Sequence, residues 1–537
     1  MTGTPLTPEL DALVVGAGFA GLHMLHRLRS DGLRVRLVEA GDDVGGTWYW
    51  NRYPGARCDF ESHDYSYAFD DALQREWDWT ERYATRPEIH RYLAHVADRF
   101  GLRESIDLRT RVEATEFDES AVLWRVTAKG PDGSRTTSAR WLILATGALS
   151  VPRLPDLPGL PSFGGRVLHT ADWPHEPVDL RGKRAAVVGT GSSGVQVLPE
   201  IAEQADHVTV LQRTAGWVVP ARNRPLSAAE RQAVQSDYPA YRSRADEAFL
   251  GVHFEPAGPS ALEATPAERT AAYESRWLDG GSQILTTYPD LLVNTDANAT
   301  LADFLRGKIA EAVSDDATVR ALTPSFPVGA KRIVVGTEYY ELFERGDVEL
   351  VDLRSTPLLG VTPTGLRFAD GEVPVDVLVC ATGFDALTGP LFAIDVQGRG
   401  GRALRDAWAG GPLTQLGLGT AGFPNLFPIA GPGSPSVMSN VPRCTELQVD
   451  WIADLIDHLR THGLTSVEAT PQAQQDWTAH VSEIAEATVL TATDSWYLGA
   501  NVPGKPRVFM PYAGGMPEYR RRCADSAAAG YSGFTLT

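Results

Sequence analysis

Two glycine-rich turns supply the clearest chemistry in this chain of 537 residues. Residues 16–21 read Gly-Ala-Gly-Phe-Ala-Gly, and residues 189–194 read Gly-Thr-Gly-Ser-Ser-Gly. Each turn follows a short apolar run and precedes a stretch of helical composition, so each is expected to join a buried strand to a helix. Such a turn presents backbone N–H groups to a phosphate at the helix N-terminus. We therefore predict two dinucleotide sites, with these phosphate-turn glycines: Gly16, Gly18, Gly21, Gly189, Gly191 and Gly194.

The two units differ in charge where their second strands end. The strand expected at residues 34–38 ends at Glu39, whose carboxylate can accept hydrogen bonds from a ribose diol and would repel a 2′-phosphate. The strand expected at residues 207–211 is followed by Gln212, Arg213 and Thr214, and a cation with a hydroxyl suits a 2′-phosphate. The first unit is thus predicted to hold FAD or NAD and the second NADPH. Together they predict bound FAD that NADPH reduces.

Two other enzyme classes are disfavoured by the sequence. Disulfide oxidoreductases of similar architecture need a closely spaced pair of redox cysteines, and the four cysteines here are far apart. A serine hydrolase needs the pattern G-x-S-x-G, which residues 191–194 do not supply. The cysteines also lack the spacing of a metal site or of a secreted disulfide scaffold, so we expect reduced thiols and no metal.

Composition favours a soluble protein that acts on a small molecule. The length predicts about three or four domain-sized units. The hydrophobic fraction is 43% and the formal net charge is −19, which disfavours binding to nucleic acid or to an anionic membrane. Residues 1–5 lack the start of an export signal, and no apolar stretch is long enough to span a membrane. We therefore expect a cytoplasmic protein, either a monomer or a weak homo-oligomer.

Two longer patterns carry a family resemblance. Residues 163–174 lie between the two turns and read F-x-G-x-x-x-H-x-x-x-W-P, and residues 45–59 read G-G-x-W-x-x-x-x-Y-P-G-x-x-x-D. Every fixed position of both patterns is filled as in the flavin-dependent type I Baeyer–Villiger monooxygenases. The chain resembles this family from about residue 11 to its C-terminus, and its layout is most similar to the phenylacetone and steroid monooxygenase subgroup.

The resemblance implies two catalytic residues. Arg332 is the central one, because a permanently protonated guanidinium can stabilise the negatively charged peroxide that reduced flavin forms with O2. Asp59 lies near the flavin and orients Arg332. Without the resemblance, Lys331 and Arg332 would be an ordinary basic pair. Lys331 is a second candidate partner for the 2′-phosphate, beside Arg213.

Other residues take conformational, cofactor or substrate roles by the same resemblance. His169, which could otherwise be a core histidine, couples domain movement to catalysis together with Trp173. Trp496, in residues 495–505, is expected at the surface of a mobile loop that folds over the nicotinamide cofactor. Further cofactor-binding candidates are Gly46, Thr47, Trp48, Ser192, Ser193, Gln196, Arg213 and Thr214, and substrate-wall candidates are Ser436, Val437 and Val441.

The expected fold class is α/β, with two Rossmann-like dinucleotide-binding domains and an inserted helical subdomain. Residues 227–230 and 265–268 have the form of capping boxes, which supports helices in the insertion. Apolar residues at helical spacing between Leu301 and Val313 support another helix there. The predicted boundaries are 1–148 and 385–537 for the FAD-binding domain, 149–217 and 331–384 for the NADP-binding domain, and 218–330 for the helical insertion.

The implied activity inserts one oxygen atom next to a ketone carbonyl and gives an ester or lactone. The expected partners are O2 and an aryl, cyclic or steroid-like ketone, with thioether oxidation as a side activity. Two alternatives remain: a flavin monooxygenase that oxidises amine nitrogen or sulfur, and a non-catalytic flavin-binding redox sensor. Oxygen-inserted products from ketones would distinguish the expected activity from the first alternative. Arg332→Ala would distinguish it from the second, because an enzyme should lose oxygenation and keep flavin reduction, whereas partner binding by a sensor should not depend on that arginine.

Overall fold

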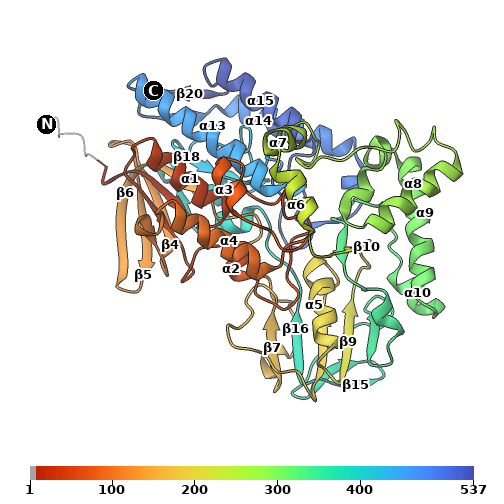
Figure 1. Ribbon diagram of the computed structural model, residues 1–537. Helices are drawn as coiled ribbons and strands as arrows, with labels where there is room; N and C mark the ends of the chain where they lie inside the picture. Colours follow the sequence, from red (N-terminus) through yellow and green to blue (C-terminus); the bar gives the residue numbers. More distant parts are fainter. Residues whose placement is uncertain (1–7) are drawn as a thin grey trace.

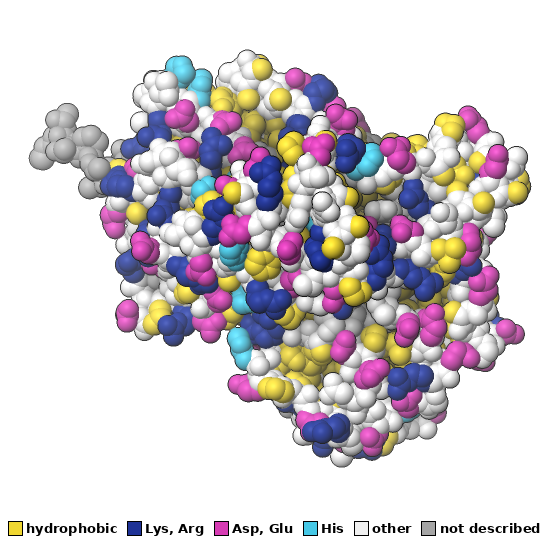
Figure 2. All heavy atoms as spheres, in the orientation of Figure 1, with side chains coloured by type: hydrophobic (Ala, Val, Ile, Leu, Met, Phe, Trp, Pro, Cys, Tyr) yellow, Lys and Arg dark blue, Asp and Glu magenta, His cyan; other side chains and the backbone are white. Residues whose placement is uncertain are grey.

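The computed structural model describes residues 8–537 and consists of two α/β units and a helical region. Figure 1 shows a first α/β unit on the left, a second below it and a helical region on the right. Residues 1–5, on which the expected absence of an export signal depends, lie outside the described part. Within residues 8–537, no helix is long and apolar enough to cross a membrane. Acidic and basic side chains are interspersed over the face seen in Figure 2.

The first unit contains an eight-stranded sheet in the order β17-β4-β5-β6-β1-β2-β3, with β18 also paired to β6. The strands β3, β2, β1, β6 and β18 run parallel, and β4, β5 and β6 form an antiparallel meander. Their bounds are β1 Leu10–Val15, β2 Val35–Val38, β3 Ile106–Asp107, β4 Arg111–Asp118, β5 Leu123–Gly130, β6 Gly133–Leu144, β17 Asp395–Gln397 and β18 Leu426–Pro428. Helix α1 (Phe19–Ser30) follows β1 and packs against α13 (Val441–Thr461).

The second unit contains a five-stranded parallel sheet in the order β12-β9-β8-β16-β7. Its strands are β7 Arg166–His169, β8 Arg184–Val188, β9 His207–Gln212, β12 Val348–Asp352 and β16 Val377–Cys380. Helix α5 (Ser192–Ala202) follows β8 as α1 follows β1, so the expected strand-turn-helix pattern is present in both units. The antiparallel strands β13 Gly360–Val361, β14 Gly365–Phe368 and β15 Gly371–Pro374 form a small separate sheet.

The helical region lies between two short strands that pair with each other, β10 (Val218–Pro220) and β11 (Val334–Gly336). Both expected capping boxes are present, at Ser227 with Glu230 and at Thr265 with Glu268. The helices are α6 Ala228–Gln235, α7 Tyr238–Asp246, α8 Pro266–Asp279, α9 Thr295–Ala312 and α10 Asp316–Leu322. The apolar face expected on α9 is buried at Leu301, Leu305 and Ile309.

The remaining helices cover the first unit, on which both N-terminal and C-terminal segments pack. They are α2 Thr47–Trp50, α3 Asp71–Glu76, α4 Arg86–Arg99, α11 Thr388–Phe392, α12 Leu404–Ala407, α14 Pro471–Glu486 and α15 Met516–Ala528. Strands β19 (Val467–Ala469) and β20 (Phe534–Leu536) pair near the C-terminus. In Figure 1, α13 and α15 lie close to α7 of the helical region, and Asp246 of α7 pairs with a residue of each.

The chain crosses between the two α/β units twice, and the two crossing segments lie side by side. The Arg153 N–H donates to the Gly383 carbonyl at 3.0 Å, and the Asp385 N–H donates to the Val151 carbonyl at 2.9 Å. A short bridge at Pro152 and Phe384 also joins them. Because both crossings are adjacent, a rotation of one unit relative to the other must bend them together.

Candidate active site

The first phosphate turn is closed by backbone packing. A Cβ atom on Gly16 would lie 2.5 Å from the Ala145 carbonyl oxygen, and one on Gly21 would lie 1.8 Å from the Gly16 oxygen. The backbone of Gly46 lies against Gly18, where a Cβ on Gly46 would come within 2.8 Å of the Gly18 Cα. The N-terminus of α1 has no side-chain cap and no acidic residue in its first turn. Its free N–H groups therefore fit the pyrophosphate of a dinucleotide.

The second phosphate turn repeats this geometry with one difference. A Cβ on Gly189 would lie 2.6 Å from the Ala381 oxygen, and one on Gly194 would lie 2.1 Å from the Gly189 oxygen. By contrast, a Cβ on Gly191 would meet nothing within 4 Å. The N-terminus of α5 also lacks a side-chain cap and an acidic first turn, and Ser192 and Ser193 lie in that turn. These residues fit a second pyrophosphate.

Glu39 is 5% exposed and lies against the first turn. One carboxylate oxygen accepts a hydrogen bond from the Ala17 N–H at 2.7 Å, and the other accepts one from the Gly41 N–H at 2.7 Å. These bonds fix the carboxylate at the end of β2, and each oxygen keeps a lone pair for a ribose hydroxyl. Its role toward a ribose stays a prediction.

Arg213 and Lys331 lie near each other at the end of the second unit. Burial, followed by the charge of Arg213, lowers the pKa of Lys331. The Lys331 ammonium lies 5.1 Å from the centre of the Phe326 ring. Within residues 8–537, neither cation forms an ion pair with a carboxylate, although the charge of Asp494 opposes part of the lowering of the Lys331 pKa. Arg213 is exposed. Two unpaired adjacent cations fit a 2′-phosphate, and Thr214 lies beside them with its carbonyl accepting from Thr190 at 3.3 Å.

Arg332 and Asp59 form a bidentate ion pair. The Arg332 Nε and Nη2 atoms donate to the two Asp59 carboxylate oxygens at 2.8 and 2.9 Å, and Nη1 donates to the Val437 carbonyl at 2.8 Å. Burial by itself disfavours the charged guanidinium, but the Asp59 carboxylate outweighs burial and raises the pKa of Arg332 above its ordinary value. The pair joins three segments that are far apart in sequence and holds a fixed positive charge where they meet.

The segment 45–59 belongs to the first unit, contacts α5 of the second and ends at Asp59. Trp48 is buried and donates from its indole to the Tyr65 hydroxyl at 3.3 Å, whereas Thr47 is exposed at the start of α2. The Tyr53 hydroxyl donates to Gln196 on α5 at 2.8 Å, and Gln196 donates to the Arg57 carbonyl at 3.1 Å. The structure therefore gives Gln196 contacts between the units, and its cofactor role stays a prediction.

Residues 163–174 contact both the segment 45–59 and the crossings. The Trp173 carbonyl accepts a hydrogen bond from Arg52 at 3.2 Å. The Nδ1 atom of His169 accepts from the Ala171 N–H at 3.1 Å, and its Nε2 atom lies 3.3 Å from the Arg153 carbonyl. This pattern describes a neutral ring that donates through Nε2, and burial lowers its pKa accordingly. His169 thus lies directly against one crossing segment.

Ser436, Val437 and Val441 lie around the N-terminus of α13. Ser436 is fully buried with a φ of 43°, a conformation that costs energy outside glycine, and its hydroxyl donates to the Ala430 carbonyl at 2.8 Å. Val437 is 7% exposed and supplies the carbonyl that Arg332 contacts. Val441 is half-buried at the first position of α13. The structure therefore brings this predicted wall next to the Arg332–Asp59 pair.

The expected surface position of Trp496 is wrong for this conformation. Trp496 is half-buried and packs with a small apolar cluster that contains Ala386, Leu387 and Met510. Its loop is tied to a crossing segment, because Lys505 forms an ion pair with Asp385 at 2.6 Å. The composition of the loop predicted mobility but could not show which segment it docks against.

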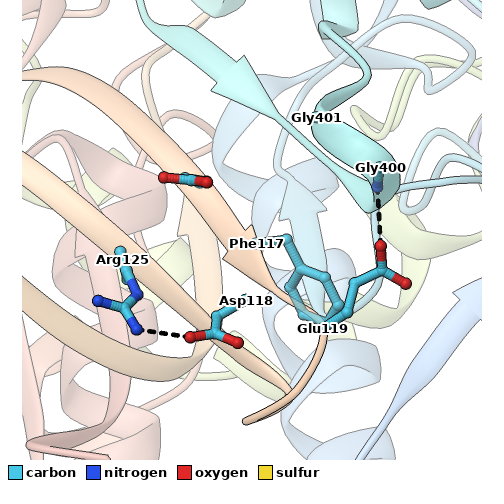
Figure 3. Close-up of a pocket in the computed structure, with 7 residues that line it drawn as sticks. Phe117, Asp118, Glu119, Arg125, Gly400 and Gly401 are labelled. Atoms are coloured by element: carbon cyan, nitrogen blue, oxygen red, sulfur yellow. Dashed lines mark hydrogen bonds and ion pairs between the residues drawn. The ribbon is translucent and has the colours of Figure 1, made fainter.

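Tyr497 is a site residue that the sequence did not single out. Its side chain is 2% exposed and lies close enough to the Arg332 guanidinium to feel its charge. Burial raises the pKa of Tyr497 to about 12, although the nearby Arg332 charge opposes that shift. Its position next to Trp496 was the one available signal. A separate surface pocket, shown in Figure 3, lies between Asp118, Arg125 and Gly400 and shares no residue with this site.

Comparison with known proteins places this geometry in a family. The family model described as "Pyridine nucleotide-disulphide oxidoreductase" matches residues 10–237. A Baeyer-Villiger monooxygenase of Pseudooceanicola batsensis is 40% identical over 528 residues, which cover 98% of this chain and 96% of that protein. An oxidised steroid monooxygenase bound to NADP superposes with a TM-score of 0.94 at 48% identity, covering 98% of this chain and 99% of that one. The complex of OTEMO with FAD and NADP gives a TM-score of 0.94 at 37% identity, covering 99% and 100%.

Two dinucleotide-binding folds in one chain, superposing on solved structures that hold NADP or both FAD and NADP, define the class of flavin- and NADP-dependent monooxygenases. Within that class, the chain belongs to the Baeyer–Villiger monooxygenases. The α/β fold class, the enzyme class and the cofactors FAD and NADPH, all expected from the sequence, are confirmed.

Proposed function

We propose that this enzyme inserts one oxygen atom next to the carbonyl of an aryl, cyclic or steroid-like ketone and uses Arg332 as its central catalytic residue. The observation that carries the proposal is the Arg332 guanidinium, which Asp59 clamps through both carboxylate oxygens beside the Val437 carbonyl. A guanidinium fixed in this way keeps its positive charge at every working pH. A preorganised charge of this kind stabilises negative charge that develops during oxygen transfer.

The cofactors supply the redox chemistry when bound: NADPH provides the hydride and FAD activates O2. The residues of the chain then have distinct proposed tasks. Gly16, Gly18 and Gly46 shape the flavin pyrophosphate turn, and Glu39 binds the ribose. Lys331 and Arg213 bind the 2′-phosphate of NADPH, while Asp59 keeps the Arg332 guanidinium oriented toward the reacting atoms.

A neutral ketone suits the proposed substrate wall. Ser436 is fully buried and bonded to the backbone, so the side chains that the turn and α13 can offer are those of Val437 and Val441. Apolar walls of this kind favour aryl or alicyclic groups and give no counter-charge to an ionised ligand. We expect thioether oxidation as a side activity. A thioether sulfur is a nucleophile toward activated oxygen, whereas a ketone carbonyl is an electrophile, so the two reactions use opposite reactivities of the oxygen.

His169 and the loop 495–505 are proposed to couple the position of the two units to turnover. His169 lies against Arg153 in one crossing, and Lys505 is bonded to Asp385 in the other. A rotation of the units changes both contacts at once, because the crossings are paired with each other.

The test is direct. Purified enzyme with NADPH, O2 and a panel of aryl and cyclic ketones should give esters or lactones that are one oxygen atom heavier, detected by mass spectrometry. Arg332→Ala should lower ester formation by about 100-fold or more while NADPH still bleaches the flavin absorbance. Arg332→Lys keeps a charge but not the bidentate geometry, so it should recover only part of the activity. A panel that yields only hydrogen peroxide contradicts the proposal.

A further inference from the structure

Asn440 is a buried asparagine at the start of α13 whose side chain does not cap that helix. It is the N-cap residue of α13, where an asparagine usually accepts a hydrogen bond from the first turn of its own helix. The structure shows no such bond, and Asn440 is 0% exposed. The Oδ1 atom has no hydrogen-bond partner in the described part of the chain, so only the Nδ2 group offsets the cost of burying this amide.

The amide of Asn440 bonds to two other segments of the molecule. Its Nδ2 donates to the Asp64 carbonyl at 2.7 Å and to the Gly251 carbonyl at 3.4 Å, while its backbone N–H donates to the Leu250 carbonyl at 2.8 Å. Asp64 follows the segment that ends at Asp59, and residues 247–251 are the turn after α7 of the helical insertion. Asn440 therefore bonds the turn after α7 of the insertion to the first unit through both its side chain and its backbone.

Neighbouring contacts join the same two surfaces, which we call the seam: residues 241–251 of the insertion on one side, and Asp64 with the N-terminus of α13 on the other. The Tyr241 hydroxyl on α7 donates to an Asp64 carboxylate oxygen at 2.7 Å. The last residue of α7, Asp246, is paired with Arg443 one turn into α13 and with Arg520 at 2.8 Å. In Figure 1, α7 lies close to α13, as these contacts require. The turn after α7 is thus held over the N-terminus of α13.

This seam lies next to the catalytic pair. Asn440 is three residues beyond Val437, whose carbonyl accepts from Arg332 at 2.8 Å, and one residue before Val441. The intervening turn is compact, because the Ser439 hydroxyl donates to the Ser436 carbonyl at 3.2 Å. A shift of the Asn440 backbone is therefore transmitted to the Val437 carbonyl and to the turn 247–251 together.

We propose that Asn440 is a positioning residue that sets substrate size, by fixing the distance between the insertion turn 247–251 and the wall at residues 436–441. The inference rests on the proposed function, in which that wall contacts the ketone. Loss of the amide loosens the insertion turn, although the Asn440 N–H still bonds to the Leu250 carbonyl and the Met516 N–H to the Phe249 carbonyl. A large ketone then loses contacts that a small ketone never makes. Reacting atoms that are held less firmly also let the activated oxygen escape as hydrogen peroxide.

The experiment compares Asn440→Ala with Asn425→Gly in the flavin-loaded enzyme. Asn425 is also 0% exposed, and its amide donates to the Thr465 carbonyl at 3.0 Å, but it contacts neither the insertion nor the 436–441 wall. Glycine is the matched replacement there, because the φ of Asn425 is 58°. Both variants lose a buried amide, so a general loss of stability affects both.

For Asn440→Ala, we expect KM for a bulky aryl ketone to rise about 5-fold or more while KM for acetone changes less than about 2-fold. The fraction of consumed NADPH that appears as hydrogen peroxide should rise, and flavin reduction should be unchanged. Hydrogen exchange of peptides covering residues 247–251 should become faster in Asn440→Ala and stay unchanged in Asn425→Gly. Unchanged exchange there, or an equal KM ratio in both variants, overturns the inference.

Tyr241→Phe keeps the test decisive if Asn440→Ala does not fold. It removes only the hydroxyl that binds Asp64, so it should shift the KM ratio and the exchange rate in the same direction by a smaller factor. No shift in either measurement overturns the inference. If the wild-type enzyme oxidised no ketone, that result would contradict the proposed function. The exchange measurement would still test whether Asn440 holds the turn 247–251.

Discussion

The two phosphate turns share one plan but differ in how much of the site the protein closes by itself. In both turns, a carbonyl from an Ala-Thr-Gly segment opposes the first glycine, at Ala145 in one unit and Ala381 in the other. In the first unit, the backbone of Gly46 also covers Gly18, and Glu39 is buried against the turn. In the second unit, Gly191 faces open space and Arg213 is exposed.

This difference matches the two tasks of a monooxygenase with two nucleotides. A cradle whose walls are formed by backbone and by a satisfied carboxylate is preorganised, which favours tight and lasting binding. An open turn with unpaired charges needs little rearrangement for its ligand to enter or leave, and it recognises the ligand by electrostatics. We therefore expect the first unit to hold the flavin more tightly than the second unit holds its coenzyme.

Alanine at the third glycine of each turn gives the largest expected effect. In Gly21→Ala, the new Cβ would lie 1.8 Å from the Gly16 oxygen, and in Gly194→Ala it would lie 2.1 Å from the Gly189 oxygen. Neither contact can be relieved by a side-chain rotation, so each should cost about 3 kcal/mol or more. Flavin content measured by absorbance separates them: Gly21→Ala should lose flavin, and Gly194→Ala should keep flavin that NADPH no longer reduces. Equal flavin loss in both variants would contradict the comparison.

Removing Lys331 or Arg213 from the second unit should have the next largest effect. Lys331→Ala and Arg213→Ala should each raise KM for NADPH by about 10- to 30-fold and leave KM for NADH nearly unchanged, because only the 2′-phosphate loses a partner. Steady-state NADPH and NADH oxidation measure this directly. Lys183→Ala removes an exposed charge from the start of the same sheet and serves as the control. An equal rise for both coenzymes would show that these cations are structural.

A pH dependence should follow from the environment of Lys331. Burial and the neighbouring Arg213 lower the pKa of Lys331, so its charge is lost at a lower pH than that of an ordinary lysine. The 2′-phosphate then loses one partner, and KM for NADPH should rise by severalfold as pH increases through that lowered pKa. KM for NADH should stay level over the same range. Lys331→Arg should flatten the NADPH profile, because a guanidinium does not titrate there. A steep profile in that variant would assign the titration to another group.

The parts of this site that the sequence predicted are those whose chemistry is local. A strand, a glycine turn and a helix follow one another directly, so the positions of Gly16 and Gly189 in the fold could be inferred from adjacent residues. The residue that closes each turn could not, because Ala145 and Ala381 reach the turns only through strand pairing. The antiparallel strands β4 and β5 were missed as well, although alternation along residues 111–118 was a usable signal.

The Arg332 site shows the same limit more sharply. Without the family resemblance, Arg332 is one half of a basic pair and Asp59 is one acid among many. Their contact joins residues far apart in the chain, and its third partner is a backbone carbonyl that carries no sequence signal. The expected surface position of Trp496 was wrong for a related reason, because the apolar cluster that covers it exists only after the crossing segment at residues 383–387 is in place. Its contact with the coenzyme stays a prediction.

The smallest expected effect is the most specific test of the difference between the turns. In Gly191→Ala the new methyl meets nothing within 4 Å, and in Gly18→Ala it meets the Gly46 Cα at an ordinary 3.5 Å. Both residues are N-caps with negative φ, so alanine should cost the fold only about 0.5 kcal/mol in each. A thermal melt should therefore barely change, whereas NADP affinity in Gly191→Ala should fall by about threefold or more, because the methyl lies where the backbone approaches a phosphate. Gly18→Ala should weaken flavin retention and leave NADP affinity as it was. A large loss of stability in Gly191→Ala would mean that the space beside it is not kept open for a ligand.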